Sequence, residues 1–592
     1  MLSLRFLQRS NAPQMAGAIK NTWGPLAAVC VLVIGVYAYL AQSGLLELLS
    51  PNAASTYYNL LVQSFRAGQL NLKAEVPPGL AQLRNPYDPD ANSPYRLMPY
   101  RLHDLSYYNG RLYLYHGVTP ALILFWPFVA LTGNYLLHRQ AVEIFCTIGF
   151  LASVGLLHAL WRRYFADVRV GVVAACALAL ELATGMPVLL SRSDVYEVPI
   201  SCGYMLAMLA LAAIWCALHE PERRCQWLAM ASLAYGLAVG ARPSLLFGAV
   251  ILLVPVVQAW RELWPRKLAG VLAATVPIIL IGLGLMLYNV RRFGSPSEFG
   301  VHYLLAGDSH SASVRHFSLG YLWFNLRVYF LKSVGWSRHF PYVRPMVLPP
   351  LPPGHGSVEG TFGILANIPL AWLALALPLA WRNRSVETGS TLRWFVTAVA
   401  LLFGTSALII GLFYYASVRY EVEFLPELLL LVVVGILGFE QALADRPAWR
   451  YGIRWFWGLL LCFSVVFNLL ASVEYHAAAH DTLGVQLTQA GKPFEAVGQF
   501  EQALRLYPDY PKARLNLGIA LEQMGRVPEA IEQYQQALHL NPDYAKAHFN
   551  LAVALEHSGK IPDAIQHYQQ ALRLNPDLAD ARTALARLQA GH

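Results

Sequence analysis

Carboxylates and arginines stand at the ends of several apolar stretches of this chain, where together they could bind a phosphate and remove a proton. Asp194 and Glu197 lie three residues apart beside one apolar stretch, and Arg242 follows another. Arg419 and Tyr420 precede a third. A guanidinium binds phosphate oxygens through parallel N–H donors, and a carboxylate can take a proton from a hydroxyl group. These residues therefore predict a site for a phosphate-linked substrate.

Two long polar segments, 46–112 and 291–360, add further residues of the same types. Asp88 and Asp104 belong to the first, and Arg291 begins the second. The base candidates are Asp88, Asp104, Asp194 and Glu197, and the phosphate-binding candidates are Arg242, Arg291, Arg419 and Tyr420. Glu197 either orients the base or holds a divalent metal ion. The sequence indicates no certain cofactor.

Each candidate also has a structural interpretation. Asp88 lies in an Asp-Pro-Asp sequence that is typical of surface turns. Asp194 and Glu197 can form a local ion pair with Arg192, since carboxylates beside an apolar stretch need a partner or water. Arginines at the ends of such stretches also extend toward lipid headgroups. His103, His116 and His302 are too scattered to predict a metal site.

The composition indicates a membrane protein. Of the 592 residues, 56% are hydrophobic and only 13% are charged, and the mean hydropathy is +0.41. Such values are typical of chains that a lipid bilayer surrounds. Apolar stretches of spanning length occur at roughly 23–44, 141–160, 169–190, 198–218, 227–242, 244–260, 269–289, 361–381, 395–415, 424–440 and 455–473.

Basic residues gather in alternate connections between these stretches. The clusters are Arg162/Arg163/Arg169, Arg223/Arg224, Arg261/Arg266/Lys267, Arg382/Arg384/Arg393 and Arg446/Arg450/Arg454, and the N-terminal segment adds Arg5, Arg9 and Lys20. Because short cytoplasmic loops are enriched in Lys and Arg, we expect an inner-membrane protein with a cytoplasmic N-terminus, which acts as a signal anchor. Both long polar segments and the C-terminal region then lie outside the cytoplasm.

The apolar stretch Tyr115–Gly133 would reverse this orientation if it crossed the membrane. It contains Pro120 and Pro127, which disfavour a regular spanning helix. We therefore expect a re-entrant or juxtamembrane helix and about eleven spans. If the stretch does cross, every later connection changes sides.

The C-terminal region contains an internal repeat of 34 residues. Three series of residues keep this interval: Gly491, Gly525 and Gly559; Pro508, Pro542 and Pro576; and Phe500, Tyr534 and Tyr568. This is the tetratricopeptide repeat (TPR) period, in which helix pairs stack into a solenoid. We expect a membrane domain over 1–475 and a TPR domain over 477–592, with repeats 477–510, 511–544 and 545–578 and a capping helix within 579–592.

Charge and position within the repeats suggest the type of partner. Residues 477–592 hold 10 basic and 12 acidic residues, a net charge of −2, so the chain's net charge of +9 belongs to the membrane part and does not indicate nucleic-acid binding. Lys512 and Asn516, and then Lys546 and Asn550, lie four residues apart on the first helices of successive repeats, so each pair shares a face. They could bind a peptide carboxylate, or they could bond neighbouring repeats.

The order of these features resembles that of the GT-C-fold membrane glycosyltransferases, especially the protein O-mannosyltransferase and aminoarabinose-transferase-like branch, over about residues 20–440. The motifs are Asp194-Val-Tyr-Glu197-Val-Pro199, Arg242 after a glycine-rich stretch, and Arg419-Tyr420 before a stretch that contains Pro426. One departure is that residues 51–59, where the family has its acidic motif, contain no Asp or Glu. Either another carboxylate has taken the role of base, or catalysis has been lost.

The resemblance implies an all-α, polytopic membrane enzyme followed by a TPR α-solenoid. Its expected activity is transfer of a sugar from a polyprenyl-phosphate carrier to an acceptor outside the cytoplasm, and the repeats would bind that acceptor or a partner protein. Two alternatives remain. The chain could be a non-enzymatic membrane-anchored scaffold for envelope assembly, or a lipid-linked polymer ligase or flippase.

Overall fold

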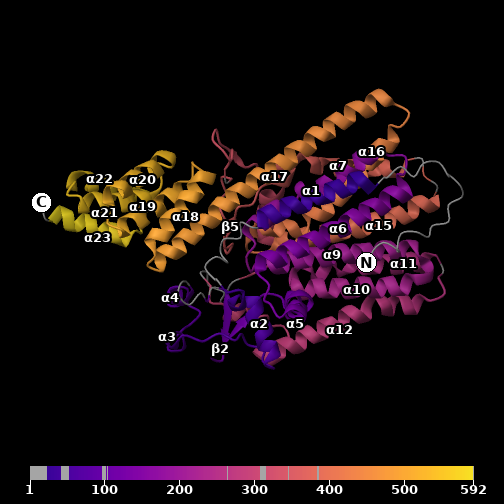
Figure 1. Cartoon of the computed structure of the whole chain (residues 1–592), viewed down its shortest axis with the longest axis horizontal. Helices are drawn as coiled ribbons and strands as arrows, with labels where there is room; N and C mark the ends of the chain where they lie inside the picture. The colour runs from indigo at the N-terminus through magenta and orange to yellow at the C-terminus, as the bar shows by residue number, and fades with distance from the viewer. Residues whose placement is uncertain are drawn as a thin grey trace.

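The computed structural model describes residues 23–41, 52–96, 102, 104–262, 264–306, 315–344, 346–382, 384 and 386–590. The N-terminal basic residues and His103 lie outside these ranges. The described chain is mostly helical, with three two-stranded sheets in the connections. A helix bundle holds the first three quarters of the sequence, and the C-terminal repeats extend from one end of it (Figure 1).

Eight helices of the described chain are long and apolar enough to cross a membrane, or nine if the bent pair α7 (Val170–Leu182) and α8 (Met186–Arg192) counts as one. They are α1 (Trp23–Ala41), α6 (His138–Tyr164), α9 (Glu197–His219), the continuous η5 (Pro243–Leu252) and α11 (Leu253–Arg261), α12 (Lys267–Phe293), α15 (Val386–Leu412), α16 (Leu425–Ala442) and α17 (Pro447–Gln489). Each coincides with an apolar stretch of the sequence.

The two remaining predicted stretches form helices that are not among these eight or nine candidate spans. The helix α10 (Arg224–Ala241) packs against α9 and α12, and η8 (Pro369–Trp381), a 3-10 helix that follows α14 (Ile364–Asn367), packs against α16. Glycines on α16 allow this close approach, because a Cβ added to Gly438 would lie 2.8 Å from Ala380 N. Small residues at such contacts are typical of helices packed within membranes.

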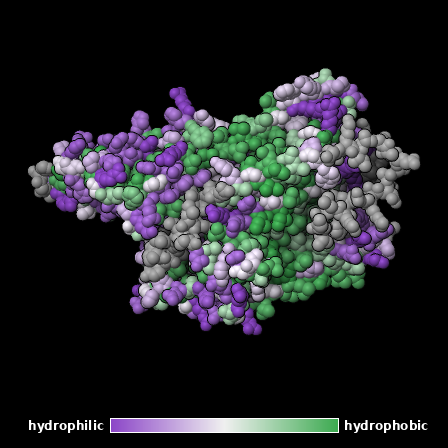
Figure 2. Space-filling model, viewed as in Figure 1, coloured by the Kyte–Doolittle hydropathy of each residue, from purple (hydrophilic) through white to green (hydrophobic). Residues whose placement is uncertain are grey.

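The surface of the bundle separates into three zones. Hydrophobic side chains form a band across the helices, with hydrophilic side chains on both sides of it (Figure 2). One hydrophilic side carries the two long polar segments and the repeats, and the other carries the connections between α10 and α9 and between α11 and α12 (Figure 1). This arrangement is the one that a bilayer-spanning bundle requires.

The first polar segment covers the bundle with short elements. These are η2 (Ala53–Ser55), α2 (Tyr57–Arg66), α3 (Pro78–Ala81), α4 (Ser93–Arg96), β1 (Leu105–Tyr108) and β2 (Arg111–Leu114). The strands form a hairpin whose turn, Asn109-Gly110, has φ of 47° and 72°, the left-handed pair that a type I′ turn requires. Asn59, in the region that lacks an acid, is fully buried and donates to Leu136 O at 2.7 Å.

The stretch after this hairpin does not form a long helix. It contains a π-helical turn, η3 (Ala121–Phe125), and α5 (Trp126–Thr132), which ends at Gly133. Twelve helical residues extend only about 18 Å, compared with a hydrocarbon core of about 30 Å. The length fits the expectation that this stretch does not cross the membrane.

The second polar segment is joined to the bundle by the pairing of one of its strands with a strand that precedes α16. Its elements are η6 (Val301–Tyr303), α13 (Leu319–Leu326), η7 (Arg327–Leu331), β3 (Gly335–Trp336), β4 (Val343–Arg344) and β5 (Val358–Glu359). β5 pairs in parallel with β6 (Ala416–Ser417), which precedes η9 (Val418–Glu423), and Glu359 lies opposite Ser417. This pairing places Glu359 beside η9.

The C-terminal repeats form a helical solenoid, as the 34-residue period predicts. The helices are the end of α17 and then α18 (Pro493–Leu506), α19 (Pro511–Gln523), α20 (Val527–Leu540), α21 (Ala545–His557), α22 (Ile561–Leu574) and α23 (Ala579–Ala590). The three repeat glycines have φ of 72°, 76° and 75°, the left-handed conformation for which glycine is preferred. The helix α17 continues without a break from the bundle into the first repeat.

We expect Tyr534→Ala to loosen the solenoid, because Tyr534 is fully buried against Gly518. Truncating a buried aromatic residue reduces stability by about 3–5 kcal/mol, and repeats depend on their neighbours. Amide hydrogen exchange of the full chain should therefore accelerate across α19, α20 and α21. Tyr534→Phe removes only the hydroxyl that donates to Glu522 at 2.9 Å and should have a small effect; equal exchange in both variants would contradict this account.

The solenoid also contacts the second polar segment. Asp509, between α18 and α19, accepts hydrogen bonds from Ser337 Oγ at 3.2 Å, His339 Nδ1 at 2.8 Å and Arg344 NH2 at 3.2 Å. Tyr475 on α17 donates to Gly360 O. The first repeat is thereby joined to the segment that carries Glu359.

Candidate functional site

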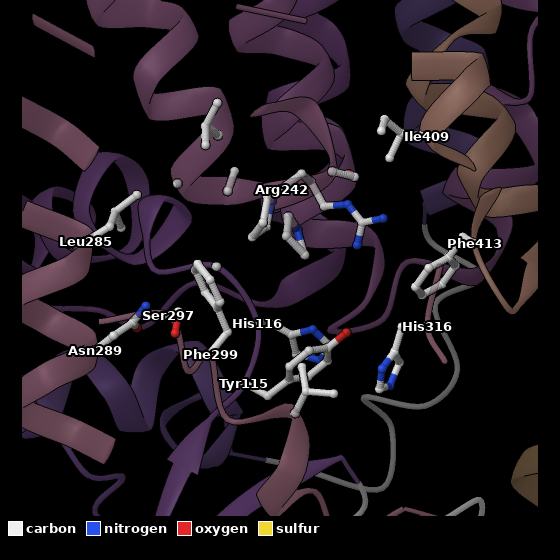
Figure 3. Close-up of a pocket in the computed structure, with 18 of the residues that line it drawn as sticks. Tyr115, His116, Arg242, Leu285, Asn289, Ser297, Phe299, His316, Ile409 and Phe413 are labelled. Carbon is white, nitrogen blue, oxygen red and sulfur yellow. The ribbon is translucent and has the colours of Figure 1, made fainter. Parts of the chain in front are cut away.

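A cavity of about 770 Å³ lies where α10, α12 and α15 end near the polar segments. Its walls include the apolar side chains Val239, Phe247, Leu285, Phe299, Ile409, Ile410 and Phe413, and the polar or aromatic side chains Tyr115, His116, Arg242, Asn289, Arg292, His316, Tyr420 and Glu423. Figure 3 shows Arg242 between Leu285 of α12 and Ile409 of α15, with Tyr115 and His116 nearby. The cavity is therefore apolar toward the bundle and polar toward the two long polar segments.

Arg242 lies at the end of α10 and is paired with a carboxylate. Its Nε donates to Glu423 Oε1 at 2.6 Å, and Ser244 Oγ donates to the other carboxylate oxygen at 2.6 Å. The guanidinium also lies over the Tyr420 ring, 5.2 Å from its centroid. Glu423 therefore neutralises Arg242 within the cavity wall.

Arg419 belongs to a second cluster, in which two arginines alternate with two glutamates. Glu359 accepts hydrogen bonds from Arg419 NH2 at 2.7 Å and from Arg192 NH1. The Oε1 atom of Glu197 lies 3.6 Å from Arg192 Nε and 3.8 Å from Arg419 NH1. Burial acts to raise the pKa of Glu359, but the charges of Arg419 and Arg192 hold that pKa well below its usual value. These four residues form the four-charge cluster.

Asp104 is connected to this cluster through a tyrosine. Tyr196 Oη donates to Asp104 Oδ2 at 2.6 Å, and the Tyr196 ring lies beneath Arg419, with the guanidinium 4.9 Å from its centroid. Asp104 has φ of 57° and donates its backbone N–H to Leu305 O at 3.0 Å. The strained left-handed conformation of a non-glycine residue is common at functional sites.

His116 lines the cavity next to this group. Its ring is 5.2 Å from the Tyr196 ring, and its Nε2 is buried with no hydrogen-bond partner among the described residues. Burial lowers the pKa of His116 to about 3; Asp104 opposes that shift, whereas Arg242 and Arg419 add to it. The imidazole is therefore neutral at physiological pH and can offer or accept one hydrogen bond in the cavity.

The structure brings together five of the eight residues that the sequence suggested for this site. Asp104, Glu197, Arg242, Arg419 and Tyr420 all belong to the cavity wall or to the clusters beside it. Asp194 lies next to them; its backbone N–H donates to Glu197 Oε2 at 2.9 Å, and its side chain accepts from Val195 N.

Asp88 and Arg291 are placed elsewhere. Asp88 is exposed and accepts the backbone N–H groups of Asp90 at 2.9 Å and Ala91 at 3.2 Å, as an aspartate in a surface turn does. Arg291 is exposed on the last turn of α12, whereas its neighbour Arg292 is buried and lines the cavity. The sequence suggested Arg291, whereas the structure places its neighbour Arg292 in the cavity wall.

Sequence reasoning also missed several site residues. Glu359 stands in a polar loop, 60 residues before Arg419, and only the pairing of β5 with β6 brings the two together. Glu423 follows Arg419 by four residues and pairs instead with Arg242. His116 was considered only as a scattered metal ligand; it lies two residues after β2, whose last three residues are buried.

The site does not fit a divalent metal ion. Among the described residues, no three His, Cys, Asp or Glu side chains gather closely enough to hold a metal. Glu197, the suggested ligand, is fully buried between two arginines. No step proposed below involves a metal.

The lysine and asparagine residues proposed for partner binding divide into two pairs. Asp481 on α17 lies 3.2 Å from Lys512 Nζ and accepts a 2.7 Å hydrogen bond from Asn516, so this pair bonds neighbouring repeats. In the next repeat, Lys546 is exposed and Asn550 is half-buried. A peptide carboxylate would have to displace Asp481 to engage the first pair.

Comparisons with known proteins identify the repeats. The tetratricopeptide repeat family profile matches residues 483–538 and 519–579, so the C-terminal region consists of tetratricopeptide repeats, a class of protein-interaction module. A comparison with curated proteins gives no match.

The similar solved structures include two TPR domains and one further protein, MamA. One is the second TPR domain of human RPAP3 in complex with an HSP70 peptide, with 23% identity over 19% of this chain and 94% of that chain and a TM-score of 0.19. The Arabidopsis OM64 TPR domain has 19% identity over 20% and 98%, with a TM-score of 0.20. MamA has 19% identity over 26% and 76%, with a TM-score of 0.19.

Proposed function

We propose that the chain is a polytopic membrane glycosyltransferase, which moves a sugar from a polyprenyl-phosphate carrier to a hydroxyl acceptor outside the cytoplasm. The observation that carries this proposal is the cavity at the end of the bundle, apolar on one side and lined by arginine, histidine and tyrosine on the other. An apolar chain with a phosphate at its end matches such a cavity. The order of motifs that resembles GT-C enzymes supports the same reaction.

The chemistry requires one base. The acceptor hydroxyl attacks the anomeric carbon, the bond from that carbon to the phosphate oxygen breaks, and the phosphate leaves with the electron pair. The hydroxyl proton passes to a carboxylate. We assign this role to Asp104, because it accepts a hydrogen bond from Tyr196 beside the cavity and belongs neither to the four-charge cluster nor to the surface turn. The configuration at the anomeric carbon is inverted by this single displacement.

The repeats would bind the acceptor protein or a partner protein. Their contacts support a position near the site, since Asp509 and Tyr475 bond to the segment that contains Glu359. A protein held by the solenoid would then lie on the same side of the bundle as the cavity. The continuous helix α17 keeps the two parts in one orientation.

The function is tested by transfer of a radiolabelled sugar from polyprenyl-phosphate carriers in membranes that contain the chain. We expect transfer of the sugar to a hydroxyl acceptor and release of the polyprenyl phosphate as the second product. Absence of transfer from any polyprenyl-phosphate sugar would sink the enzymatic proposal. It would favour the scaffold alternative, with which the complete pairing of Arg192, Arg242 and Arg419 with glutamates also agrees.

The orientation is tested by cysteine labelling of intact cells. In a background without the native cysteines, Glu501→Cys should react with an impermeant maleimide, and Arg223→Cys should react only after permeabilisation. Both positions are exposed, and Arg223 lies in a basic connection that the positive-inside rule assigns to the cytoplasm. Labelling of position 501 only after permeabilisation would reverse the orientation and remove the acceptor-binding role.

A further inference from the structure

Arg292 differs from the other arginines of the site because no carboxylate neutralises it. Its side chain is only 6% exposed. NH1 donates to Leu114 O at 2.9 Å and NH2 donates to Asn289 Oδ1 at 2.8 Å. Among the described residues, no ion pair joins Arg292 to an acid, and its buried Nε has no hydrogen-bond partner.

A buried cation of this kind needs a compensating charge. Removing an ion from water costs several kcal/mol unless a counterion or hydrogen bonds replace the water. Arg292 lies on the last turn of α12, where the helix dipole supplies only about half a negative charge. A guanidinium has five N–H donors, and the two neutral oxygens that Arg292 contacts leave three of them without an oxygen partner. The guanidinium also lies over the Tyr288 ring, 3.9 Å from its centroid, which replaces only part of the lost hydration.

Glu298 is an acid close to Arg292, but its carboxylate is already hydrogen-bonded to other groups. Its carboxylate accepts hydrogen bonds from Gly300 N and His302 Nδ1. Glu298 lines the same cavity but does not reach ion-pair distance of Arg292. The compensating anion is therefore expected to occupy the cavity itself.

The surroundings of Arg292 indicate what carries this anion. Asn289 and Ser297 line the cavity beside it and appear together on one side of the cavity in Figure 3. Leu285 continues the same wall one turn further along α12, and Phe247, another lining residue, is 63% exposed on the bundle surface. The polar corner of the cavity is thus continuous with apolar side chains of α12 and η5.

We propose that Arg292, with Asn289 and Ser297, binds the phosphate group of a lipid phosphate. The apolar chain of this lipid leaves the cavity past Leu285 and Phe247. This assignment rests on the proposed function for the isoprenoid nature of the chain, and it replaces Arg242 and Arg419 as the phosphate-binding residues. Those two are already neutralised by Glu423 and Glu359.

Binding to the purified full-length chain in nanodiscs tests this proposal. The probes are a sugar-free polyprenyl phosphate, the matching polyprenol, inorganic phosphate and phosphatidylglycerol. We expect Arg292→Gln to weaken polyprenyl phosphate binding about 10- to 100-fold, as loss of charged hydrogen bonds does, and to leave polyprenol binding unchanged. Arg291→Gln is the matched control, because it removes the same charge from an exposed position on the same helix turn, and it should bind as the unaltered chain does.

A second measurement uses the unaltered chain, so it does not depend on the variant folding. Phenylglyoxal modification, mapped by mass spectrometry, should be blocked at Arg292 by polyprenyl phosphate and not by polyprenol, whereas Arg291 should react in both cases. Equal modification of Arg292 with and without the lipid phosphate would overturn the proposal. So would an Arg292-dependent site that takes inorganic phosphate or phosphatidylglycerol as tightly as polyprenyl phosphate.

The outcomes separate this proposal from the enzymatic one. Arg292-dependent binding of polyprenyl phosphate without any sugar transfer would uphold the phosphate site and refute the glycosyltransferase. Full binding of the lipid phosphate and undiminished transfer by Arg292→Gln would uphold the enzyme and refute the phosphate site.

Discussion

Replacement of Asp104 by asparagine should lower the rate of sugar transfer by about 10²-fold or more, in line with the contribution of a general base. Asparagine keeps the shape of the side chain and can still accept the Tyr196 hydroxyl, which lies 2.6 Å from Asp104 Oδ2. What it cannot do is take a proton from the acceptor. The measurement is single-turnover transfer in membranes at matched expression, so that substrate binding and chemistry are separated.

Two variants make the result specific to the base. Asp88→Asn removes a carboxylate that only caps a surface turn, and it should transfer at the normal rate. Tyr196→Phe removes the hydrogen bond but keeps the carboxylate, so transfer should be retained. If Asp104→Asn is as active as Asp88→Asn, the base is another residue.

The places of the apolar helices were predictable from sequence, because apolar runs of fixed length are the strongest signal that a membrane chain carries. Their number as spans was not, since eight or nine of the expected eleven are long and apolar enough in the described chain. All eleven predicted stretches coincide with helical elements. Their type was less predictable. The stretch around Pro369 and Pro378 forms a 3-10 helix, since a proline removes one backbone donor and disfavours the regular α-helix. Whether these elements cross a membrane remains a prediction.

The repeats were predictable for a different reason. A repeat of fixed length reports the same packing contact several times, and Phe500, Tyr534 and Tyr568 are all buried as their shared interval requires. The sequence did not reveal the role of Asp481, which pairs with Lys512 and accepts a hydrogen bond from Asn516. The equivalent positions of the next two repeats hold Leu515 and Phe549, so the 34-residue period does not predict an acid at position 481.

The site was only partly predictable. Residues beside apolar stretches were found because an ionisable group there needs a partner. The partners themselves lie far away in sequence: Arg242 pairs with Glu423, and Arg419 pairs with Glu359. Such pairings depend on how the two long polar segments fold over the bundle, and no local pattern encodes them. The sequence therefore suggested Arg242 and Arg419 as phosphate ligands without indicating their glutamate partners, and it suggested Arg291 rather than the buried Arg292.

Replacement of Glu359 by glutamine should destabilise the chain by about 3 kcal/mol, because removing one partner of a buried ion pair leaves charges without compensation. Arg192 and Arg419 would share Glu197 alone, at distances of 3.6 and 3.8 Å. The value lies at the lower end of the range for buried pairs, since Glu359 itself is 31% exposed. Denaturant unfolding of the purified chain in mixed micelles measures the change.

Glu421→Gln is the matched control for this loss. Glu421 is also fully buried on the neighbouring η9, but burial raises its pKa well above the usual value, despite a hydrogen bond from Phe362 N that acts to lower it. Glutamine resembles the protonated carboxyl, so this variant should keep nearly the full stability. A loss as large as that of Glu359→Gln would show that volume and hydrogen bonding, rather than charge, hold this region together.

The pH dependence gives the same distinction without a second variant. The pKa of Glu359 is lower in the folded chain than in the unfolded chain, where it is about 4.3. The contribution of Glu359 to the free energy of unfolding is therefore fully present above about pH 4.3, and it is lost as the pH falls toward the folded pKa. The stability difference between the unaltered chain and Glu359→Gln should therefore stay constant from about pH 6 to pH 8 and shrink only in acid below about pH 4. A difference that disappears near neutral pH would mean that Glu359 is not ionised beside Arg192 and Arg419, and the four-charge cluster would then need another account.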